Sequence, residues 1–180
     1  MPKQSDPNAT MYSDKSVTIG VLSDTHISEA DRSFQAQVDC AFSSCDTIIH
    51  AGDLTNRAIL DVFGDKRVYA VHGNMCNSAT KSMLPDSRIF SIDDYTFGLY
   101  HGHGIGYGIE DSLVARFSDV DCIIYGHTHA PLNHRFGSVL FVNPGSFRGT
   151  GRYGSPGTYA LLTIDTEGLS AAIHLLPQEL

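Results

Sequence analysis

Cysteine is scarce in this sequence of 180 residues, and its four copies follow no pattern. Cys40, Cys45, Cys76 and Cys122 are irregularly spaced and include no CxxC pair. The sequence therefore does not indicate a disulfide framework, and a chain of this size does not need one to fold. Free thiols in a reducing cytoplasm are the state that we expect.

Basic residues are also few, with 12 Lys and Arg against 20 Asp and Glu and a formal net charge of −8. An acidic chain gains little from attraction to a phosphate backbone, which argues against a dedicated nucleic-acid binder. A small phosphorylated substrate is still compatible with this charge, because bound metal cations can reverse the local sign.

Long hydrophobic runs are missing as well. No stretch approaches the roughly 20 apolar residues that span a bilayer, and the polar N-terminus lacks the apolar region of a signal peptide. We therefore expect a soluble, cytoplasmic protein that does not bind membranes. Residues 1–15 are predicted to form a flexible extension, or an arm that docks on a neighbouring subunit of a homo-oligomer. Residues 16–180 are predicted to form a single domain.

Short apolar runs alternate with helical patterns in the first half of the chain. We predict strands at 17–22, 46–50 and 67–71, and helices at 29–45 and 57–63. This alternation is typical of a parallel sheet built from βαβ units. The second half predicts a hairpin at 88–93 and 95–100, a helix at 107–117, a strand at 122–125, and antiparallel strands at 132–136, 139–142, 158–165 and 169–176. The pattern indicates an α/β domain with one mixed sheet or two packed sheets.

Polar residues that can bind metal follow five of the predicted strands. In chain order they are Asp24 with His26, then Asp53, then Asn74, then His101 with His103, and finally His127 with His129. Each piece alone is typical of a turn or a helix cap. Sites in α/β sheets form beyond the carboxyl ends of the strands, and five coincidences of this kind are difficult to attribute to turns. The sequence therefore predicts a functional site at one edge of the sheet.

Imidazoles and carboxylates without a thiolate favour Mn, Fe, Co, Ni or Zn over Ca or Cu(I). A carboxylate can bridge two ions, and a pair of ions roughly 3.5–4 Å apart suits in-line phosphoryl displacement. Two divalent cations bring four positive charges, of which Asp24 and Asp53 cancel two. The remaining positive charge suits a hydroxide and an anionic phosphoryl group.

The motifs D-x-H, G-D, G-N, H-G-H and G-H-x-H, in this order, resemble the calcineurin-like metallophosphoesterase superfamily over roughly residues 17–165. The short length and the Asn-Pro-Gly-Ser segment at 143–146 point to its small bacterial and archaeal phosphodiesterase branch. That branch also includes the metallophosphoesterase-like subunit of retromer. The resemblance implies a four-layer αββα fold, in which two packed mixed β-sheets are flanked by helices.

The resemblance also implies a ligand set and a reaction. Asp24, His26 and His129 would hold one divalent ion, Asn74, His101 and His127 the other, and Asp53 would bridge them. Manganese is the first choice for both ions, with Ni, Co, Fe and Zn as alternatives. A metal-bridging hydroxide would attack phosphorus in line with the departing alkoxide, so Asp53 and Asn74 belong to the catalytic set too.

The residue after Asn74 departs from the family pattern. Many members carry a histidine there that is thought to assist the leaving group, whereas this chain has Met75, which cannot donate a proton. His103, His72 and Cys76 are the nearest candidate acids, and we place His103 first; a surface or supporting role for it is equally compatible with the sequence. Without a positioned acid, substrates with good leaving groups are favoured, and diesters ahead of monoesters.

Several other residues have less specific patterns. His50 and His72 precede Gly-Asp and Gly-Asn, where they orient ligands or fill the core. Asn143 is predicted to shape a turn near the site and to bond a ligand. Arg148 and Arg152 lie in a glycine-rich loop from which they can reach an anionic substrate.

Two alternatives to a phosphodiesterase stay open from the sequence. One is a phosphomonoesterase that acts on a small phosphorylated metabolite, and the other is a non-catalytic scaffold on the same fold. Scaffold-like members tend to lose metal-binding histidines, whereas all seven ligand positions are filled here. The complete ligand set favours a catalyst.

Overall fold

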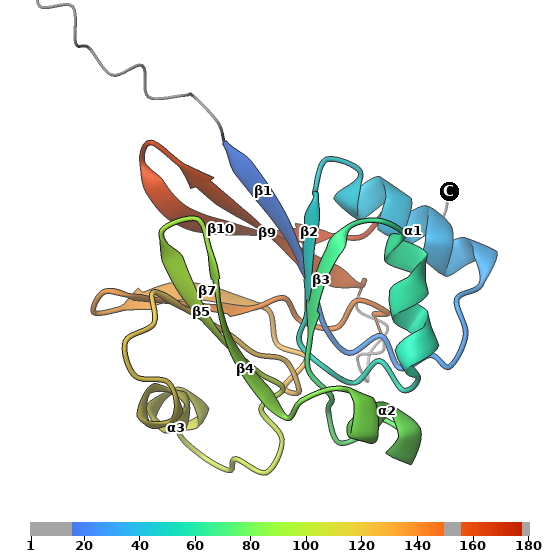
Figure 1. Cartoon of the computed structure of the whole chain (residues 1–180), viewed down its shortest axis with the longest axis horizontal. Coiled ribbons are helices and arrows are strands. Elements are labelled where there is room, and N and C mark those ends of the chain that lie inside the picture. Colours follow the sequence, from blue (N-terminus) through green and yellow to red (C-terminus); the bar gives the residue numbers. More distant parts are fainter. Residues whose placement is uncertain (1–15, 150–155, 178–180) are drawn as a thin grey trace, which may run out of the picture.

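The computed structural model describes residues 16–149 and 156–177, and its strands form two five-stranded sheets. The first sheet contains β1 (Val17–Leu22), β2 (Thr47–His50), β3 (Arg67–Ala70), β9 (Thr158–Asp165) and β10 (Gly168–Leu175), in the order β10-β9-β1-β2-β3. The second contains β4 (Ser87–Ile92), β5 (Tyr95–Tyr100), β6 (Cys122–Ile124), β7 (Leu132–Phe136) and β8 (Val139–Asn143), in the order β4-β5-β6-β8-β7. Figure 1 shows the two sheets packed face to face.

Both sheets are mixed. In the first sheet β1, β2 and β3 run parallel, while β9 pairs antiparallel with β1 and with β10. In the second sheet β5, β6 and β8 run parallel, and β4 and β7 are antiparallel edge strands. The two predicted hairpins at 88–100 and 132–142 are present. The predicted α/β architecture of two packed mixed sheets flanked by helices is confirmed.

The main core lies between the sheets, because alternate residues of each strand point toward the other sheet. Ile19 and Val21 of β1 pack there with Phe97 and Leu99 of β5, and all four side chains are fully buried. The alternate residue Leu22 faces outward into a second apolar cluster instead.

Helices cover the outer face of each sheet (Figure 1). The helix α1 (Arg32–Phe42) and the 3₁₀ helix η1 (Arg57–Phe63) pack on the first sheet, and α3 (Ile109–Arg116) packs on the second. Glycine permits this close packing on both sides. A Cβ at Gly20 would lie 2.4 Å from the ring of Phe42, and a Cβ at Gly98 would lie 2.6 Å from the ring of Phe117.

The predicted helix at 57–63 has the expected bounds, whereas the two helices predicted at 29–45 and 107–117 are shorter than expected, and the residues at their N-termini give the reason. The predicted helix at 29–45 begins only at Arg32, because the side chain of Asp31 accepts a hydrogen bond from the Phe34 N–H and caps it. The predicted helix at 107–117 begins at Ile109, after Gly108 takes a positive φ of 70°. A further short helix, α2 (Ser78–Met83), was not predicted, because its six residues carry no apolar periodicity.

Candidate metal centre

The loops after β1, β2, β3, β5 and β6 meet at one edge of the sandwich and carry the predicted site residues. Their backbone is unusual there. Five of the seven predicted ligands have φ between 49° and 67°, namely Asp24, His26, Asp53, His127 and His129. A non-glycine residue in this region costs on the order of 1 kcal/mol, and such strain clusters at functional sites. The fold therefore holds these side chains in positions that the chain would not adopt by itself.

The first group of donors consists of Asp24, His26 and His129. Oδ1 of Asp24 lies 3.0 Å from Nε2 of His129 and 3.6 Å from Nε2 of His26, and the two Nε2 atoms are 3.2 Å apart. Two imidazole nitrogens and a carboxylate oxygen thus converge on one point. This donor set suits a first-row divalent cation.

The second group consists of Asp24, Asp53 and His101, all three of them buried. Nδ1 of His101 donates to the carbonyl oxygen of Ala51 at 2.8 Å, so its Nε2 carries the free lone pair. Nε2 lies 3.1 Å from Oδ2 of Asp53 but makes no hydrogen bond in the described part of the chain. A buried nitrogen without a hydrogen-bond partner, aimed at a carboxylate, fits a cation between them.

The remaining predicted ligands lie at the rim. The ring of His127 is exposed, 5.2 Å from the ring of His101, and the His127 N–H donates to Oδ2 of Asp24 at 3.1 Å. Asn74 is also exposed, and its backbone carbonyl oxygen accepts a hydrogen bond from Nζ of Lys81. The two candidate donor groups share Asp24, whereas the resemblance to the family assigns the bridge to Asp53.

The electrostatics of the carboxylates keep both charged. Burial acts to raise the pKa of Asp24, but hydrogen bonds from His129 and His26 and the nearby His101 outweigh it and hold the pKa well below its usual range. Burial likewise acts against ionisation of Asp53, and its contact with His101 reverses the effect and lowers its pKa. Two buried anions side by side require positive charge.

The histidines divide into two classes. The hydrogen bond to Asp24 raises the pKa of His129, and for His101 the contact with Asp53 overcomes burial and raises the pKa. Burial and the neighbouring His101 lower the pKa of both His127 and His103. The carboxylates thus attract either protons or a cation at His101 and His129.

Two residues outside the ligand set hold the loops in place. Nδ2 of Asn143 donates to the Gly126 carbonyl at 3.0 Å and to Oγ1 of Thr128 at 2.9 Å, which fixes the loop bearing His127 and His129. The predicted direct bond from Asn143 to a ligand has no counterpart among these contacts.

His50 is fully buried and accepts from the Gly52 N–H at Nδ1, while Nε2 lies 3.4 Å from Oγ1 of Thr25. It therefore links the loops after β1 and β2, which is the orienting role that the sequence left open. Arg148 is exposed, and Arg152 lies outside the described residues.

A family model described as the calcineurin-like phosphoesterase superfamily domain matches residues 17–167. The chain belongs to this superfamily. A probable metallophosphoesterase of Methanocaldococcus jannaschii is 40% identical over 134 residues, covering 71% of this chain and 67% of the relative. A protein of the same archaeon named a phosphodiesterase is 28% identical and is covered over 82% of its length by 71% of this chain.

The superfamily fold is also seen in solved structures. The vacuolar protein sorting 29 protein of Cryptosporidium parvum matches with a TM-score of 0.69 at 18% identity, over 91% of this chain and 99% of that one. At this identity the likeness shows the fold alone. The predicted membership of the calcineurin-like superfamily is confirmed, and a protein named a phosphodiesterase is among its relatives.

Asp86 lies near the candidate metal centre, although no sequence motif pointed to it. His103, the predicted acid, lies with Nε2 3.8 Å from Oδ1 of Asp86, and His72 completes a third group of donors. Asp86 sits in a Leu-Pro-Asp segment before β4 that looks like an ordinary turn. Only the pairing of β4 with β5 brings it to the site.

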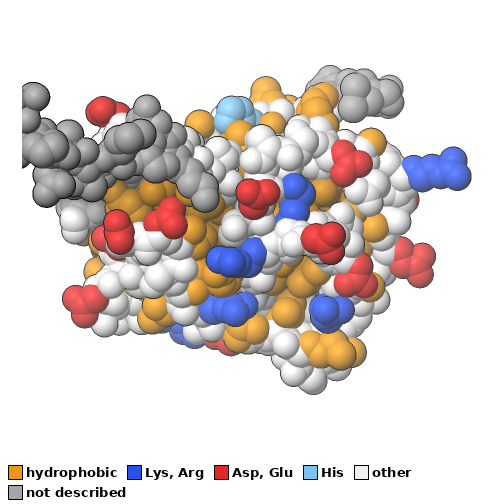
Figure 2. Space-filling view, turned by 45° about the horizontal axis from the view of Figure 1, so that its top comes forward, with side chains coloured by type: hydrophobic (Ala, Val, Ile, Leu, Met, Phe, Trp, Pro, Cys, Tyr) orange, Lys and Arg blue, Asp and Glu red, His pale blue; other side chains and the backbone are white. Residues whose placement is uncertain are grey.

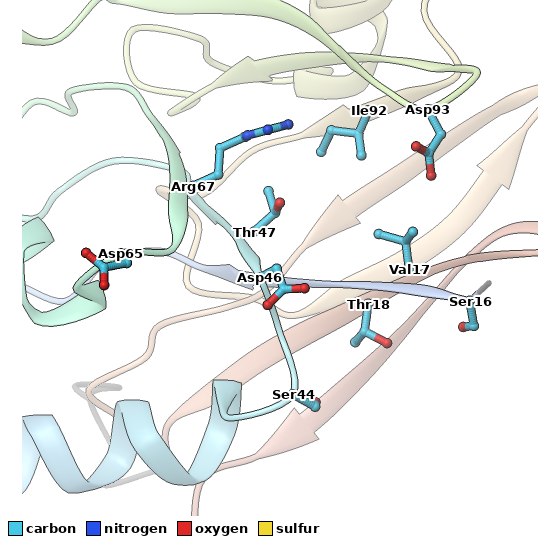
Figure 3. A pocket seen from close by; sticks show the side chains of 10 residues that line it. All are labelled: Ser16, Val17, Thr18, Ser44, Asp46, Thr47, Asp65, Arg67, Ile92 and Asp93. Carbon is cyan, nitrogen blue, oxygen red and sulfur yellow. The ribbon is translucent and has the colours of Figure 1, made fainter.

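A hollow of about 660 Å³ lies at the opposite edge, where β1, β2 and β3 begin. Figure 3 shows its three carboxylates, Asp46, Asp65 and Asp93, spread around it without converging. Acidic and basic side chains are also interspersed on the face in Figure 2. Neither view shows a gathering of donors comparable to the metal centre. No helix in the described part of the chain is long and apolar enough to cross a membrane.

Proposed function

We propose that this protein hydrolyses phosphodiesters with the help of two divalent cations. The observation that carries the proposal is the convergence of two donor groups on Asp24, one of which contains Nε2 of buried His101, an atom without a hydrogen-bond partner among the described residues. One cation would be held by Asp24, His26 and His129, and the other by Asn74, His101 and His127.

Asp53 is the bridging carboxylate in this proposal. Its Oδ1 accepts the Met75 N–H at 2.7 Å, which fixes the carboxylate, and its Oδ2 faces His101. Asp24 is held as firmly, by the backbone N–H of His127 and by His129. The number of ions lost from Asp53→Ala and from Asp24→Ala shows which of the two carboxylates is the bridge, because removal of the bridge weakens both sites.

A pair of such cations, with manganese as our first choice, supplies a nucleophile at neutral pH and neutralises charge on the phosphoryl group. The protein's own groups orient the donors. The Ala51 carbonyl fixes the His101 tautomer, and Asn143 and His50 hold the loops that carry the ligands.

The substrate preference follows from Met75, a residue that is 58% exposed and whose backbone N–H donates to the bridging carboxylate. A thioether cannot protonate a departing alkoxide, so good leaving groups are favoured. His103 lies outside the proposed ligand set with its ring centroid 5.7 Å from that of His101, but burial lowers its pKa. We propose a small phosphodiester as the substrate class, with monoesters cleaved less well.

The test is hydrolysis of bis(p-nitrophenyl) phosphate and p-nitrophenyl phosphate by the protein loaded with Mn²⁺. Asp53→Ala and His127→Ala are expected to lower activity by at least about 100-fold, since each removes a donor to a catalytic cation. His134→Ala is the matched control, because His134 pairs with Glu110 on the surface and stacks on Phe141.

Full activity in either site variant would exclude the proposed catalytic site, and an inactive metal-loaded wild type would favour the non-catalytic scaffold. A preference for the monoester would instead favour a phosphomonoesterase.

A further inference from the structure

A third set of donor side chains lies beside the proposed centre and consists of His72, Asp86 and His103. One donor atom from each lies within 4.8 Å of the donor atoms of the other two, as in both groups of the proposed centre. We propose that these three side chains bind a third divalent cation.

The three residues come from separate parts of the chain that the fold brings together. His72 follows β3 of the first sheet, His103 follows β5 of the second sheet, and Asp86 directly precedes β4. The rings of His72 and His103 are 6.0 Å apart. The third site would therefore join the edges of both sheets, as the proposed centre does.

Unused donor atoms distinguish this set from an ordinary cluster of polar residues. Nδ1 of His72 is buried and lacks a hydrogen-bond partner among the described residues; the same holds for Nδ1 of His103, although the nitrogen of His103 that faces Asp86 is Nε2. A buried imidazole nitrogen without a partner is costly unless it binds something.

Asp86 is oriented by a neighbour in a way that leaves an oxygen available. Nη2 of Arg116 donates to Oδ2 of Asp86 at 2.6 Å, while Oδ1 faces Nε2 of His103 at 3.8 Å. Arg116 is itself fixed over the ring of Tyr100, 4.2 Å from its centroid. Two imidazoles and one carboxylate are a donor set that holds Mn, Fe, Ni or Zn and leaves positions open.

An anion is the other ligand to consider, because Arg116 is close. The carboxylate of Asp86 would repel an anion at the point where the donors converge, and the Arg116 guanidinium is already bonded to Asp86 and Ser87. The geometry thus favours a cation, which is expected to bind less tightly than the first two because like charges lie nearby.

A cation at this place has a consequence for the proposed reaction, and this consequence alone rests on the proposed function. It would neutralise charge on the leaving group where Met75 offers no proton. His103 would then be a metal ligand, which replaces the acid role that the sequence predicts for it.

The experiment is a count of Mn²⁺ bound per chain, measured by equilibrium dialysis and elemental analysis on the full-length protein. We expect about three ions in the wild type at saturation, and about two in His72→Ala and in His103→Ala. Asp86→Asn keeps the volume of the side chain and is expected to weaken the third ion at least about tenfold. His134→Ala, which alters a histidine that pairs with Glu110 outside the three donor groups, is expected to keep about three.

The double variant Asp53→Ala, His129→Ala separates this site from the proposed centre. It is expected to lose phosphodiesterase activity and still bind about one ion, which His103→Ala then removes. Circular dichroism of every variant establishes that it is folded. Saturation of the wild type at about two ions, unchanged counts in His72→Ala and His103→Ala, or binding of inorganic phosphate to these residues without metal would each overturn the proposal.

Discussion

A Cβ atom at position 52 would lie 2.6 Å from Nδ1 of His101, so Gly52 and His101 can occupy their places only because Gly52 has no side chain. The backbone of Gly52 has a φ of +101°, which also favours glycine. The ring of His101 therefore packs directly on the loop that carries Asp53. This contact sets the distance between the imidazole and the carboxylate of the second donor group.

Gly52→Ala is expected to displace the His101 ring and to lower kcat/KM for the diester at least about 100-fold, since misplacement of about 1 Å has this effect. Gly64→Ala is the control. Gly64 also has a positive φ, of 56°, but a Cβ there would have nothing within 4 Å. It is expected to lose about 1–3 kcal/mol of stability with full activity. Equal activity losses in the two variants would refute the role assigned to the contact.

Asn143→Ala removes the two hydrogen bonds that hold the loop of His127 and His129. We expect metal affinity to fall about 10–100-fold, the usual effect of losing a residue that orients ligands, with activity restored by excess Mn²⁺. Asn133→Ala, which removes a hydrogen bond from Asn133 to the Ala171 carbonyl far from the ligands, is the control. Titration calorimetry measures the metal affinity of both variants. Unchanged affinity in Asn143→Ala would show that the loop keeps its conformation without these two hydrogen bonds.

Metal affinity is expected to rise with pH. The pKa values of His101 and His129 are raised in the metal-free protein, mainly through Asp53 for His101 against its burial and through Asp24 for His129. Protons therefore occupy these rings as pH falls toward and below neutral, and a cation must displace them. Affinity should increase up to about tenfold per pH unit for each proton displaced. Calorimetry in buffers of different ionisation enthalpy reports the proton release, and its absence at pH 6 would contradict the prediction.

His50 is expected to make the metal-free protein sensitive to acid. Burial lowers the pKa of His50 to about 4 from an ordinary value of 6.5, so between these values the unfolded chain binds the proton and the folded chain does not. Stability therefore falls as pH falls through this window, by about 2 kcal/mol at pH 5. Urea unfolding at pH 7 and pH 5 should show a smaller loss for His50→Gln than for the wild type. An identical loss in both would exclude His50 as the cause.

The sequence predicted most of the fold because its early strands are short, apolar and separated by clear helix patterns. The runs at 17–22 and 46–50 agree with β1 and β2 to within one residue. It could not predict that β9 pairs with β1, because that contact joins residues more than a hundred positions apart. Helix ends were overestimated where a cap such as Asp31 outweighed apolar periodicity.

The site was predictable to the extent that its residues follow strands. Asp24 and Asp53 could be placed together from the parallel order of β1 and β2, whereas His101 follows β5 of the other sheet. Asp86 could not, because it precedes a strand and its approach to His103 depends on the hairpin of β4 and β5. Nor does a residue pattern reveal that Asp24 belongs to both donor groups, which depends on how two separate sheets face each other.

The candidate metal centre lowers the stability of the metal-free domain, because five of its residues adopt a left-handed backbone. These residues are Asp24, His26, Asp53, His127 and His129. Replacement of such a residue by glycine removes a ligand and relieves local strain in the same step. In the metal-free protein, loss of such a ligand is then expected to favour folding. The two-sheet fold can therefore be retained in a protein that has lost these metal ligands.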